Sequence, residues 1–308
     1  MEIFESLLSK RGLILQKIAE ELLFIEMNDR IPSVGKFSEK FNVGRGTVQT
    51  ALKYLEKSGC IKLEARGHLG TFLRMKEIPQ LFKYCGAERL TGVMPLPYSK
   101  KYEGLASGLT SEFEKNHLNL SIAFMRGAKL RLEEVSKGRY DFALVSKFSA
   151  AEAVKQDPQL SIALSFGKNS YVSKHAIFFS DKGKNEINNG MKVGIDNFST
   201  DQKILLNAEV NKKEVEFVEL NYMHLLQHLR AKTIDATIWN IDEVDCEMYH
   251  TRPLTSEIAK KEEAKIGEAV CVIRKENIKT EFILQHLVLN EITKIQALVE
   301  KGVFIPKY

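Results

Sequence analysis

Three polar residues within a stretch of five, Arg45, Thr47 and Gln49, carry hydrogen-bonding groups that can pair with nucleic-acid bases. An arginine guanidinium can donate two parallel hydrogen bonds to guanine, and a glutamine amide can pair in the same way with adenine. A threonine offers a hydroxyl for a phosphate and a methyl group for contact with thymine. We expect these side chains to lie on one face of a short helix and to reach base edges.

The residues around them predict the elements that would position this helix. Its opposite face is apolar at the spacing of a helix packed on a core, at Val48, Ala51, Leu52 and Leu55. Gly59 is expected to end the helix, because glycine tolerates the left-handed conformation beyond a helix end. Two short strands follow, Cys60–Glu64 and Thr71–Leu73. The loop that joins them carries Arg66 and His68, and its glycines are Gly67 and Gly70. Helix, stop and charged hairpin in this order are typical of a winged helix-turn-helix.

Upstream residues supply the rest of such a unit. A first helix has an apolar stripe formed by Leu13, Ile14, Ile18, Leu22, Leu23 and Ile25. The turn Ile31-Pro32-Ser33 places a proline to start a second helix and a serine to cap it. Phe37 and Phe41 put that second helix on the same core, and the chain turns at 42–44 into the helix of Arg45.

The sequence resembles the GntR family of bacterial transcription regulators over about residues 10–75. The resemblance lies in three elements at the right spacing, namely the turn 31–33, the recognition helix that begins at 44–49 and the wing at 67–72. There are two departures from the family pattern. Gln49 stands where the family usually has a second arginine, and Val34-Gly35-Lys36 replaces an acidic–basic pair.

The resemblance implies double-stranded operator DNA as the partner. Arg45 would meet the major groove, Arg66 and His68 would follow the adjacent minor groove, and lysines would contact phosphates. The expected DNA contacts are Lys36, Arg45, Thr47, Gln49, Lys53, Arg66, Gly67 and His68. One recognition helix covers few base pairs, so we expect a homodimer. An apolar stripe of Phe4, Leu7 and Leu8 could serve the dimer or pack on the second domain.

Composition agrees with a DNA-binding protein of ordinary globular character. The 308 residues are 44% hydrophobic and 28% charged, with a net charge of +5. Residues 42–76 hold seven basic and two acidic side chains, which equals the excess of the entire chain and favours contact with phosphates. No apolar run is long enough for a membrane span, and the first residues are unlike a signal peptide. Four widely spaced cysteines predict reduced thiols, and we expect a cytoplasmic protein without metal or cofactor.

The remaining chain alternates strands with helices. Strands are expected at 90–94, 120–125, 141–145, 161–164, 176–179, 192–195, 215–218, 236–239 and 269–273. Helices are expected at 102–115, 130–137, 200–210, 222–231, 255–261 and 282–301. Such alternation predicts parallel sheets covered by helices. Regular patterns lapse between 73 and 92, so we place a linker at about 74–90, a DNA-binding domain at 1–78 and an effector domain at 90–308.

The second domain resembles the type 2 periplasmic-binding-protein fold, a two-lobed clamshell that cytosolic regulators also use. A strand runs into Asn197-Phe198-Ser199-Thr200 and a helix, and a unit of helix, short turn and Asp-initiated strand occurs at both 130–145 and 225–239. The combination looks most like the small YhfZ-type group, whereas most GntR proteins carry a different partner domain. The predicted fold is an α+β winged helix-turn-helix followed by an α/β two-lobed periplasmic-binding-protein-like (type 2) domain.

Residues that follow strands are the candidate ligand contacts, because backbone donors and helix N-termini gather there. They are Tyr98, Ser99, Arg126, Ser146, Lys147, Ser199, Thr200, Trp239 and Asn240. Each has a structural alternative: the hydroxyl residues could only cap helices, and Trp239 could only fill the core. Arg126 and Lys147 suggest an acidic or phosphorylated small-molecule effector.

Other constellations give weaker signals. His224 and His228 lie one helical turn apart, but the glutamate of a metalloprotease motif is absent. The acidic run 242–247 lacks the glycine turn of a calcium loop. No nucleophile elbow or phosphate-binding loop is present, so we expect no enzyme. An enzyme on the binding-protein fold and a protein-binding scaffold remain the alternatives to a ligand-controlled transcription regulator.

Overall fold

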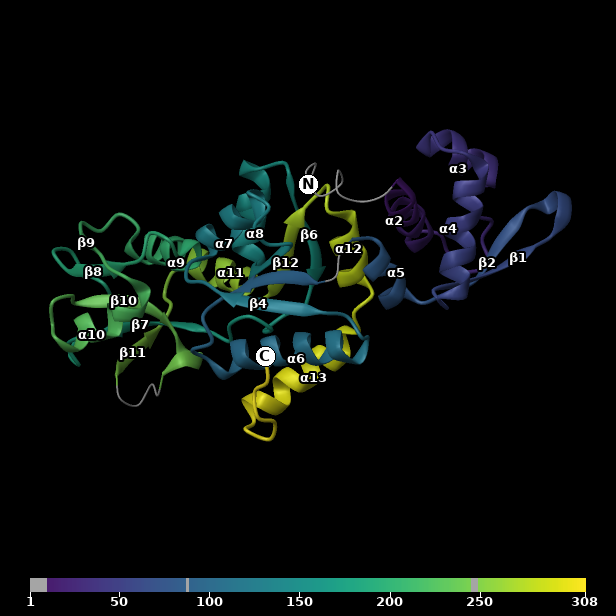
Figure 1. Ribbon diagram of the computed structural model, residues 1–308. Coiled ribbons are helices and arrows are strands. Elements are labelled where there is room, and N and C mark those ends of the chain that lie inside the picture. Colours follow the sequence, from purple (N-terminus) through teal and green to yellow (C-terminus); the bar gives the residue numbers. More distant parts are fainter. Residues whose placement is uncertain (1–9, 87–88, 245–248) are drawn as a thin grey trace. The chain divides into compact units, whose positions relative to one another are not determined.

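A computed structural model describes residues 10–86, 89–244 and 249–308 (Figure 1). It divides into two compact units, one with residues up to 89 together with 116–119, the other with 90–115 and 120–308. The apolar stripe Phe4, Leu7 and Leu8 lies outside the described residues. No helix in the described ranges is long and apolar enough to cross a membrane.

The first unit is a helix-turn-helix followed by a two-stranded wing. Its elements are α2 (Lys10–Leu23), α3 (Val34–Phe41), α4 (Arg45–Lys57), β1 (Ile61–Ala65), β2 (Thr71–Lys76) and α5 (Ile78–Tyr84). Their shared core includes Ile18, Leu22, Phe37, Val48, Leu55 and Leu73, all fully buried. The predicted order of helices and strands is confirmed, but the absence of pattern predicted after residue 73 is wrong, because β2 continues to Lys76 and α5 follows it.

Local chemistry explains where these helices begin and end. The Ser33 hydroxyl accepts a hydrogen bond from the Lys36 amide at 3.2 Å and caps α3. Asn42 ends that helix in the left-handed region at φ 52°, a conformation that asparagine tolerates better than most residues. Gly59 follows the end of α4 at φ 74°, as predicted.

The wing is tied to the helices at its base. Arg30 forms an isolated antiparallel bridge with Phe72. The Lys76 ammonium donates to the carbonyls of Leu23 and Ile25 at 2.8 and 2.7 Å, satisfying acceptors that α2 leaves free at its end. Burial lowers the pKa of Lys76. Lys76 is therefore committed to structure and is not available to DNA.

The second unit has two lobes, each built on a five-stranded sheet (Figure 1). The first lobe has strand order β4-β3-β5-β12-β6, with β3 at Leu90–Met94, β4 at Leu120–Phe124, β5 at Phe142–Ser146, β6 at Leu160–Ser165 and β12 at Ala269–Arg274. Its helices are α6 (Lys100–Lys115), α7 (Ala128–Ser136), α8 (Lys147–Gln156), α12 (Ile278–Gln285) and α13 (Leu289–Glu300).

The second lobe has strand order β11-β7-β10-β8-β9. Its strands are β7 (His175–Phe179), β8 (Lys192–Ile195), β9 (Glu216–Glu219), β10 (Ala236–Asn240) and β11 (His250–Pro253). Its helices are α9 (Thr200–Val210), α10 (Leu225–Arg230) and α11 (Glu257–Ile266), with short 3₁₀ turns at Tyr222–His224 and Ile241–Glu243.

Both sheets are mixed, so the predicted parallel pairing is confirmed for part of each sheet and wrong for the rest. In the first lobe β3 pairs parallel with β4 and β5, but β12 is antiparallel to β5 and β6. In the second lobe β7 is antiparallel to β10 and β11. The reversed strands β7 and β12 are those by which the chain enters a lobe from the other lobe. Alternation of strands and helices does not encode the direction of such an entry.

Three elements of this unit differ from the expected pattern. Helix α8 and strand β11 were not predicted, and the single helix expected at 282–301 is two helices separated at 286–288. The break follows the C-terminal cap of α12 at His286, whose amide bonds back to Phe282 and Ile283. The apolar pattern continues across the break, so the sequence does not indicate that the helix ends there.

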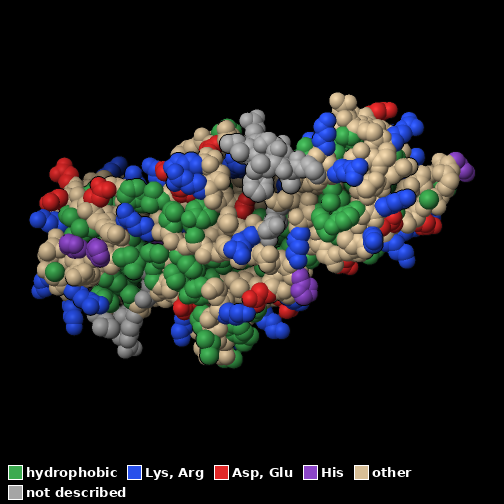
Figure 2. Space-filling view, viewed as in Figure 1, with side chains coloured by type: hydrophobic (Ala, Val, Ile, Leu, Met, Phe, Trp, Pro, Cys, Tyr) green, Lys and Arg blue, Asp and Glu red, His purple; other side chains and the backbone are tan. Residues whose placement is uncertain are grey.

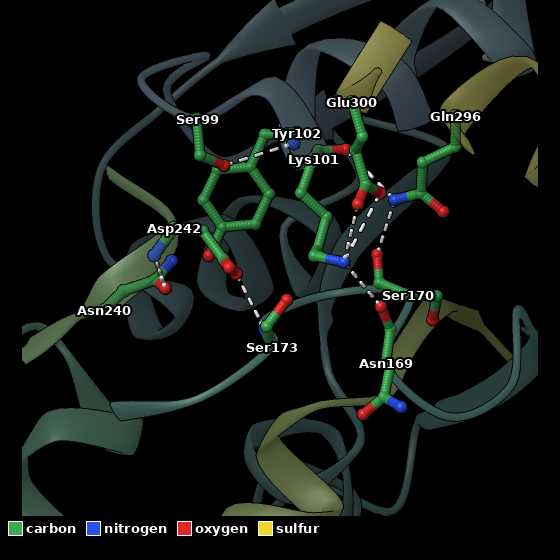
Figure 3. A network of polar contacts seen from close by, with 10 residues as sticks. All are labelled: Ser99, Lys101, Tyr102, Asn169, Ser170, Ser173, Asn240, Asp242, Gln296 and Glu300. Atoms are coloured by element: carbon green, nitrogen blue, oxygen red, sulfur yellow. Dashed lines mark hydrogen bonds and ion pairs between the residues drawn. The ribbon is translucent and has the colours of Figure 1, made fainter. Parts of the chain in front are cut away.

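The two crossings between the lobes lie side by side. The first is residues 166–174, and its Tyr171 amide donates to the Gly267 carbonyl in the second crossing at 3.1 Å. Helix α13 holds this hinge, because the Gln296 amide donates to the carbonyls of Ser170 and Lys101 at 2.8 and 3.0 Å (Figure 3). The Lys101 ammonium also reaches the Asn169 carbonyl at 2.9 Å.

Helix α13 packs closely on α6 because two glycines of α6 face it. A Cβ at Gly108 would stand 2.5 Å from the Ile292 carbonyl oxygen, and one at Gly104 would stand 2.9 Å from the Gln296 carbonyl oxygen. Backbone atoms cannot give way as a flexible side chain can, so only glycine allows this approach.

We expect Gly108→Ala to lower the free energy of unfolding of the second unit by about 1–3 kcal/mol, because the added methyl group forces α6 away from α13. Urea unfolding followed by the fluorescence of Trp239, the single tryptophan, reports this unit. The matched control is Gly183→Ala, whose Cβ would meet its nearest atom at 3.4 Å and should change stability by less than about 0.5 kcal/mol. Equal stability of the two variants would contradict the packing argument.

Candidate functional site

The exposed face of α4 is polar and partly basic. Arg45, Gln49 and Lys53 follow one another at four-residue spacing and are all exposed, whereas Thr47 is half-buried at the edge of the face. A Cβ at Gly46 would meet nothing within 4 Å. The start of α4 therefore leaves open space beside its donors, where a nucleic-acid backbone could approach.

Arg45 is the first residue of α4, and Gly44 before it provides no side-chain cap. The Thr47 amide donates to the Gly44 carbonyl at 3.0 Å, and the amides at the start of α4 receive no side-chain cap, so this helix N-terminus attracts an anion. A terminal nitrogen of Arg45 lies 3.9 Å from the position of a Cβ at Gly35, so its guanidinium lies against α3 beside the exposed Lys36. The two N-terminal turns thus bring these two basic side chains to one edge of the unit.

The wing holds its basic side chains in an ion-pair cluster. Arg66 donates to a Glu64 carboxylate oxygen at 3.1 Å and lies over the Phe72 ring at 5.2 Å. Arg74 donates to the other oxygen of Glu64 and, at 2.6 Å, to Asn28. Hydrogen bonds from Arg66 and Arg74 lower the pKa of Glu64. Arg66 therefore lies in the wing, as predicted, but a carboxylate partly neutralises it.

His68 and Gly67 are exposed in the turn between the wing strands. Figure 2 shows Lys and Arg side chains spread over this unit. Arg30 is a further basic candidate that the sequence did not predict: it is exposed, and a Cβ at Gly70 would overlap its guanidinium. The bridge to Phe72 brings Arg30 to the wing although the two residues lie about 40 positions apart in the sequence. No local pattern predicts such a contact.

We expect Arg45→Ala to weaken binding to the specific operator by roughly 1–3 kcal/mol, because a base contact is lost. Lys53→Ala is the comparison, since a lost phosphate contact should weaken all sequences about equally and lower the slope of log affinity against log salt by about one. Quantitative gel shifts on operator and random DNA at several salt concentrations separate the two. A uniform loss for Arg45→Ala would refute its role in base contact.

We expect Glu64→Gln to raise operator affinity a few-fold, because Arg66 and Arg74 lose their competing carboxylate. The control Glu56→Gln removes the same charge from α4, where the Glu56 carboxylate accepts the Leu63 amide at 3.0 Å. It should have a smaller effect on affinity. Stability should hardly change for Glu64→Gln, since exposed ion pairs contribute little. Equal gains from both variants would show that net charge alone acts.

A second candidate site is the cleft between the two lobes of the second unit. Residues from both lobes line it, among them Tyr98, Arg126, Gly127, Arg131, Tyr171, His175, Asp196, Ser199, Asp201, Gln202, Tyr222 and Asn240. The enclosed space is about 50 Å³, room for one or two water molecules. The cleft is thus nearly filled by its own side chains in this conformation.

The buried carboxylate of Asp196 organises the second-lobe side of the cleft. Its two oxygens accept the amides of Phe198 at 2.8 Å and Tyr222 at 3.0 Å. Its own amide donates to Gln202, whose side-chain nitrogen reaches the Ile238 carbonyl at 3.0 Å. These bonds fix the loop into α9 and place Tyr222 at the cleft.

Asp201 joins the lobes at the back of the cleft. Its carboxylate accepts the hydroxyls of Ser146 at 2.6 Å and Ser149 at 2.8 Å, both from the first lobe. Burial raises the pKa of Asp201, against the lowering effect of those hydroxyls. Burial thus favours the neutral form of this carboxyl, whereas the two serine hydroxyls that donate to it favour the charged form.

Two arginines line the first-lobe side of the cleft, and they differ in the hydrogen bonds that their guanidinium groups make. Arg131 is buried and donates to the carbonyls of Leu144 and Met125 and to the Tyr171 hydroxyl, at 3.2, 2.7 and 3.0 Å. Arg126 is 37% exposed, lies over the Phe198 ring at 5.0 Å and approaches Asp196 only to 3.8 Å. Arg126 is the guanidinium with capacity for a ligand.

His175 lies at the other side of the cleft, 7% exposed, with Nδ1 3.7 Å from a Glu263 oxygen. Nδ1 is buried without a hydrogen-bond partner. Burial by itself would raise the pKa of Glu263, but the His175 amide and the imidazole beside it outweigh burial and lower that pKa. A negative charge is thus held behind the imidazole.

The structure brings some of the nine predicted ligand residues together and separates the others. Tyr98, Arg126, Ser199 and Asn240 line the cleft. The other five do not. Ser99 caps α6, and Ser146 contacts Asp201. Lys147 pairs with Glu268 away from the cleft, Thr200 lines a separate groove of about 430 Å³, and Trp239 lies behind Tyr222. Sequence reasoning missed Arg131, His175 and Asp201, which lie inside helices or a strand.

The weaker constellations of the sequence stay apart from the cleft. The His228 imidazole bonds to the Thr233 hydroxyl at 2.9 Å. Asp242 accepts the Ser173 amide at 2.7 Å and so fastens the acidic run to the hinge (Figure 3). Residues 245–247 of that run lie outside the described residues. Within the described ranges, no group of three or more His, Cys, Asp or Glu side chains could hold a metal ion.

Both units match models of known protein families. Residues 77–308 match the family model of the YhfZ C-terminal domain, and residues 27–73 match a helix-turn-helix domain model. The uncharacterized protein YhfZ of Escherichia coli (strain K12) is 36% identical over 234 residues, which cover 76% of each chain.

Solved structures agree with the two-lobed fold. The crystal structure of YhfZ from Shigella flexneri is 32% identical, with a TM-score of 0.62, and covers 75% of this chain and 97% of that one. The periplasmic aliphatic sulphonate binding protein SsuA from Escherichia coli has a TM-score of 0.53 at 13% identity over 70% of this chain and 75% of its own. The second unit therefore has the periplasmic-binding-protein-like fold.

Proposed function

The chain belongs to the family of the YhfZ C-terminal domain, and we propose that it is a sequence-specific DNA-binding transcription regulator controlled by a small-molecule effector. The observation that carries the proposal is the exposed face of α4, where Arg45, Gln49 and Lys53 stand on a helix-turn-helix. The fold of the second unit supports a ligand-binding role for the cleft. In this proposal the second unit senses a ligand and performs no catalysis.

The proposal also covers the regulator family, the oligomeric state, the cellular compartment and the charge of the effector. The turn 31–33, the start of α4 and the wing support a relationship to GntR regulators, whose recognition helix enters the major groove. A homodimer would place two such helices on half-sites about one helical turn apart. A regulator of this kind acts in the cytoplasm. We take the effector to be anionic, because Arg126 is the cleft guanidinium with capacity for a ligand.

Control requires that the effector bind two conformations of the protein unequally. The hinge at 166–174 and 267–268 allows the lobes to move, and the contacts of Asp201 and Arg126 across the cleft change when they do. A ligand that replaces some of these contacts has different affinities for open and closed lobes. DNA affinity responds to that difference if the first unit binds operator unequally in the two states.

The test starts with the full chain and the DNA upstream of its own coding region. Gel shifts against random DNA of equal length should show a specific complex at low nanomolar to tens of nanomolar concentration, the usual range of specific regulators at physiological salt. Equal affinity for both DNAs would refute sequence-specific recognition there. A thermal-shift screen of anionic metabolites then identifies compounds that stabilise the second unit.

We expect any compound that binds the cleft to change operator affinity by about 5- to 150-fold, the usual size of allosteric coupling. Linkage requires that operator DNA change the affinity for the compound by the same factor, which fluorescence of Trp239 can measure. The control is Arg139→Gln, a change of an exposed arginine in the turn after α7 that does not line the cleft. A compound that binds the cleft tightly while operator affinity stays constant would contradict effector control.

A further inference from the structure

We propose that the cleft binds a planar anion of the aromatic carboxylate class, with its ring between Tyr98 and Tyr222 and its charged group against Arg126 and the first turn of α7. This inference rests on the proposed function, because it names the chemical class of the effector. It follows from three properties of the cleft: its aromatic walls, the occupation of its acidic groups and the position of its unused donors.

Aromatic rings from both lobes line the cleft and face one another. Tyr222 of the second lobe stacks on Trp239 with ring centroids 3.9 Å apart and planes 11° from parallel. Tyr98 of the first lobe lies 6.0 Å from Tyr222 at 31°. The Tyr102 ring lies 5.5 Å from that of Tyr98, and the Tyr171 ring lies 5.1 Å from that of Tyr102, measured between ring centroids. Trp239 is buried and Tyr222 is half-buried, so the pair forms a platform, and Tyr98 is its counterpart on the other lobe.

The spacing of these rings fits the insertion of one more. Stacked aromatic planes lie about 3.5–4.0 Å apart, so a third ring between Tyr98 and Tyr222 requires roughly 7–8 Å between them. The present 6.0 Å is short of that by one or two ångströms. A small rotation at the hinge would supply the difference, and it would also enlarge the enclosed space from its present 50 Å³.

The sign of the ligand charge follows from which groups are already occupied. Asp196 accepts two backbone amides, and Asp201 accepts two hydroxyls with its pKa raised by burial. Arg131 has committed its donors to two carbonyls and a tyrosine. A cation in this cleft would have to compete for acidic groups that the fold already uses.

The donors that remain point to an anion. Arg126 stands 3.8 Å from Asp196, longer than a hydrogen bond. Gly127 precedes α7 without any side-chain cap, so the amides of its first turn lack that partner. The buried His175 lines the same cavity, with its Nδ1 3.7 Å from a Glu263 oxygen. These groups come from both lobes and line one cavity.

The experiment uses the full chain and three probes of similar size: benzoate, cyclohexanecarboxylate and benzamide. Benzoate combines a planar ring with a charge, whereas each of the others keeps only one of the two. Titration is followed by the fluorescence of Trp239, which lies directly behind Tyr222, and by thermal shift. We expect benzoate to bind at least about tenfold more tightly than either comparison compound.

Variants separate the two recognition elements. Tyr98→Leu keeps an apolar side chain but removes the ring, and Arg126→Gln keeps polarity but removes the charge. Each should weaken benzoate about tenfold or more, and Tyr98→Leu should also abolish the preference for benzoate over cyclohexanecarboxylate. Arg139→Gln, the matched charge removal outside the cleft, should leave benzoate affinity within about twofold.

Equal binding of benzoate and cyclohexanecarboxylate, or benzoate affinity that survives Arg126→Gln, would overturn the inference. The inference would also be overturned if neither benzoate nor the larger indole-3-carboxylate gave a response at about 10 mM. A ligand with a dissociation constant up to about the millimolar range would be detected at that concentration. Gel shifts without a probe are run in parallel. Loss of specific DNA binding there rejects the proposed function, whereas intact DNA binding with failed carboxylate recognition rejects only this inference.

Discussion

The buried carboxylate of Asp196 is the interaction on which the cleft depends. A carboxylate removed from water must be compensated by hydrogen bonds, and here the amides of Phe198 and Tyr222 supply them from two different loops. The same bonds set the direction of α9, which carries Asp201, and hold the Tyr222 ring on Trp239. Without this anchor the second lobe would keep its sheet but would not present a defined surface to the first lobe.

Much of the first unit could be predicted because its signals are local. The apolar stripe of α4, the cap at Ser33 and the left-handed glycine at 59 each involve residues a few positions apart. The strands of the second unit were found for the same reason, since short apolar runs bounded by turns survive in any topology. The direction of β7 and β12 was missed because it depends on the two crossings between the lobes.

The candidate sites were predictable only where position along an element implies position in space. Residues just after strands reach the cleft at Tyr98, Arg126 and Asn240, as the rule for sheets of this kind suggests. His175 and Arg131 enter it from within a strand and a helix, so no rule based on loops could find them. Arg30 shows the same limit in the first unit, because a bridge to the distant Phe72 brings it to the wing.

The contacts across the cleft determine how strong an effector response can be. Tyr98 on Tyr222, Arg126 on Phe198 and the serines on Asp201 all join the lobes without a ligand. Each such contact contributes on the order of 0.5–1.5 kcal/mol, so together they are comparable with the 1–3 kcal/mol typical of allosteric coupling. A ligand that only added contacts to both conformations would shift nothing. In the mechanism that we propose, a ligand replaces the contact between Tyr98 and Tyr222 with a better one, and the aromatic pair is then the part of the cleft where binding changes conformation.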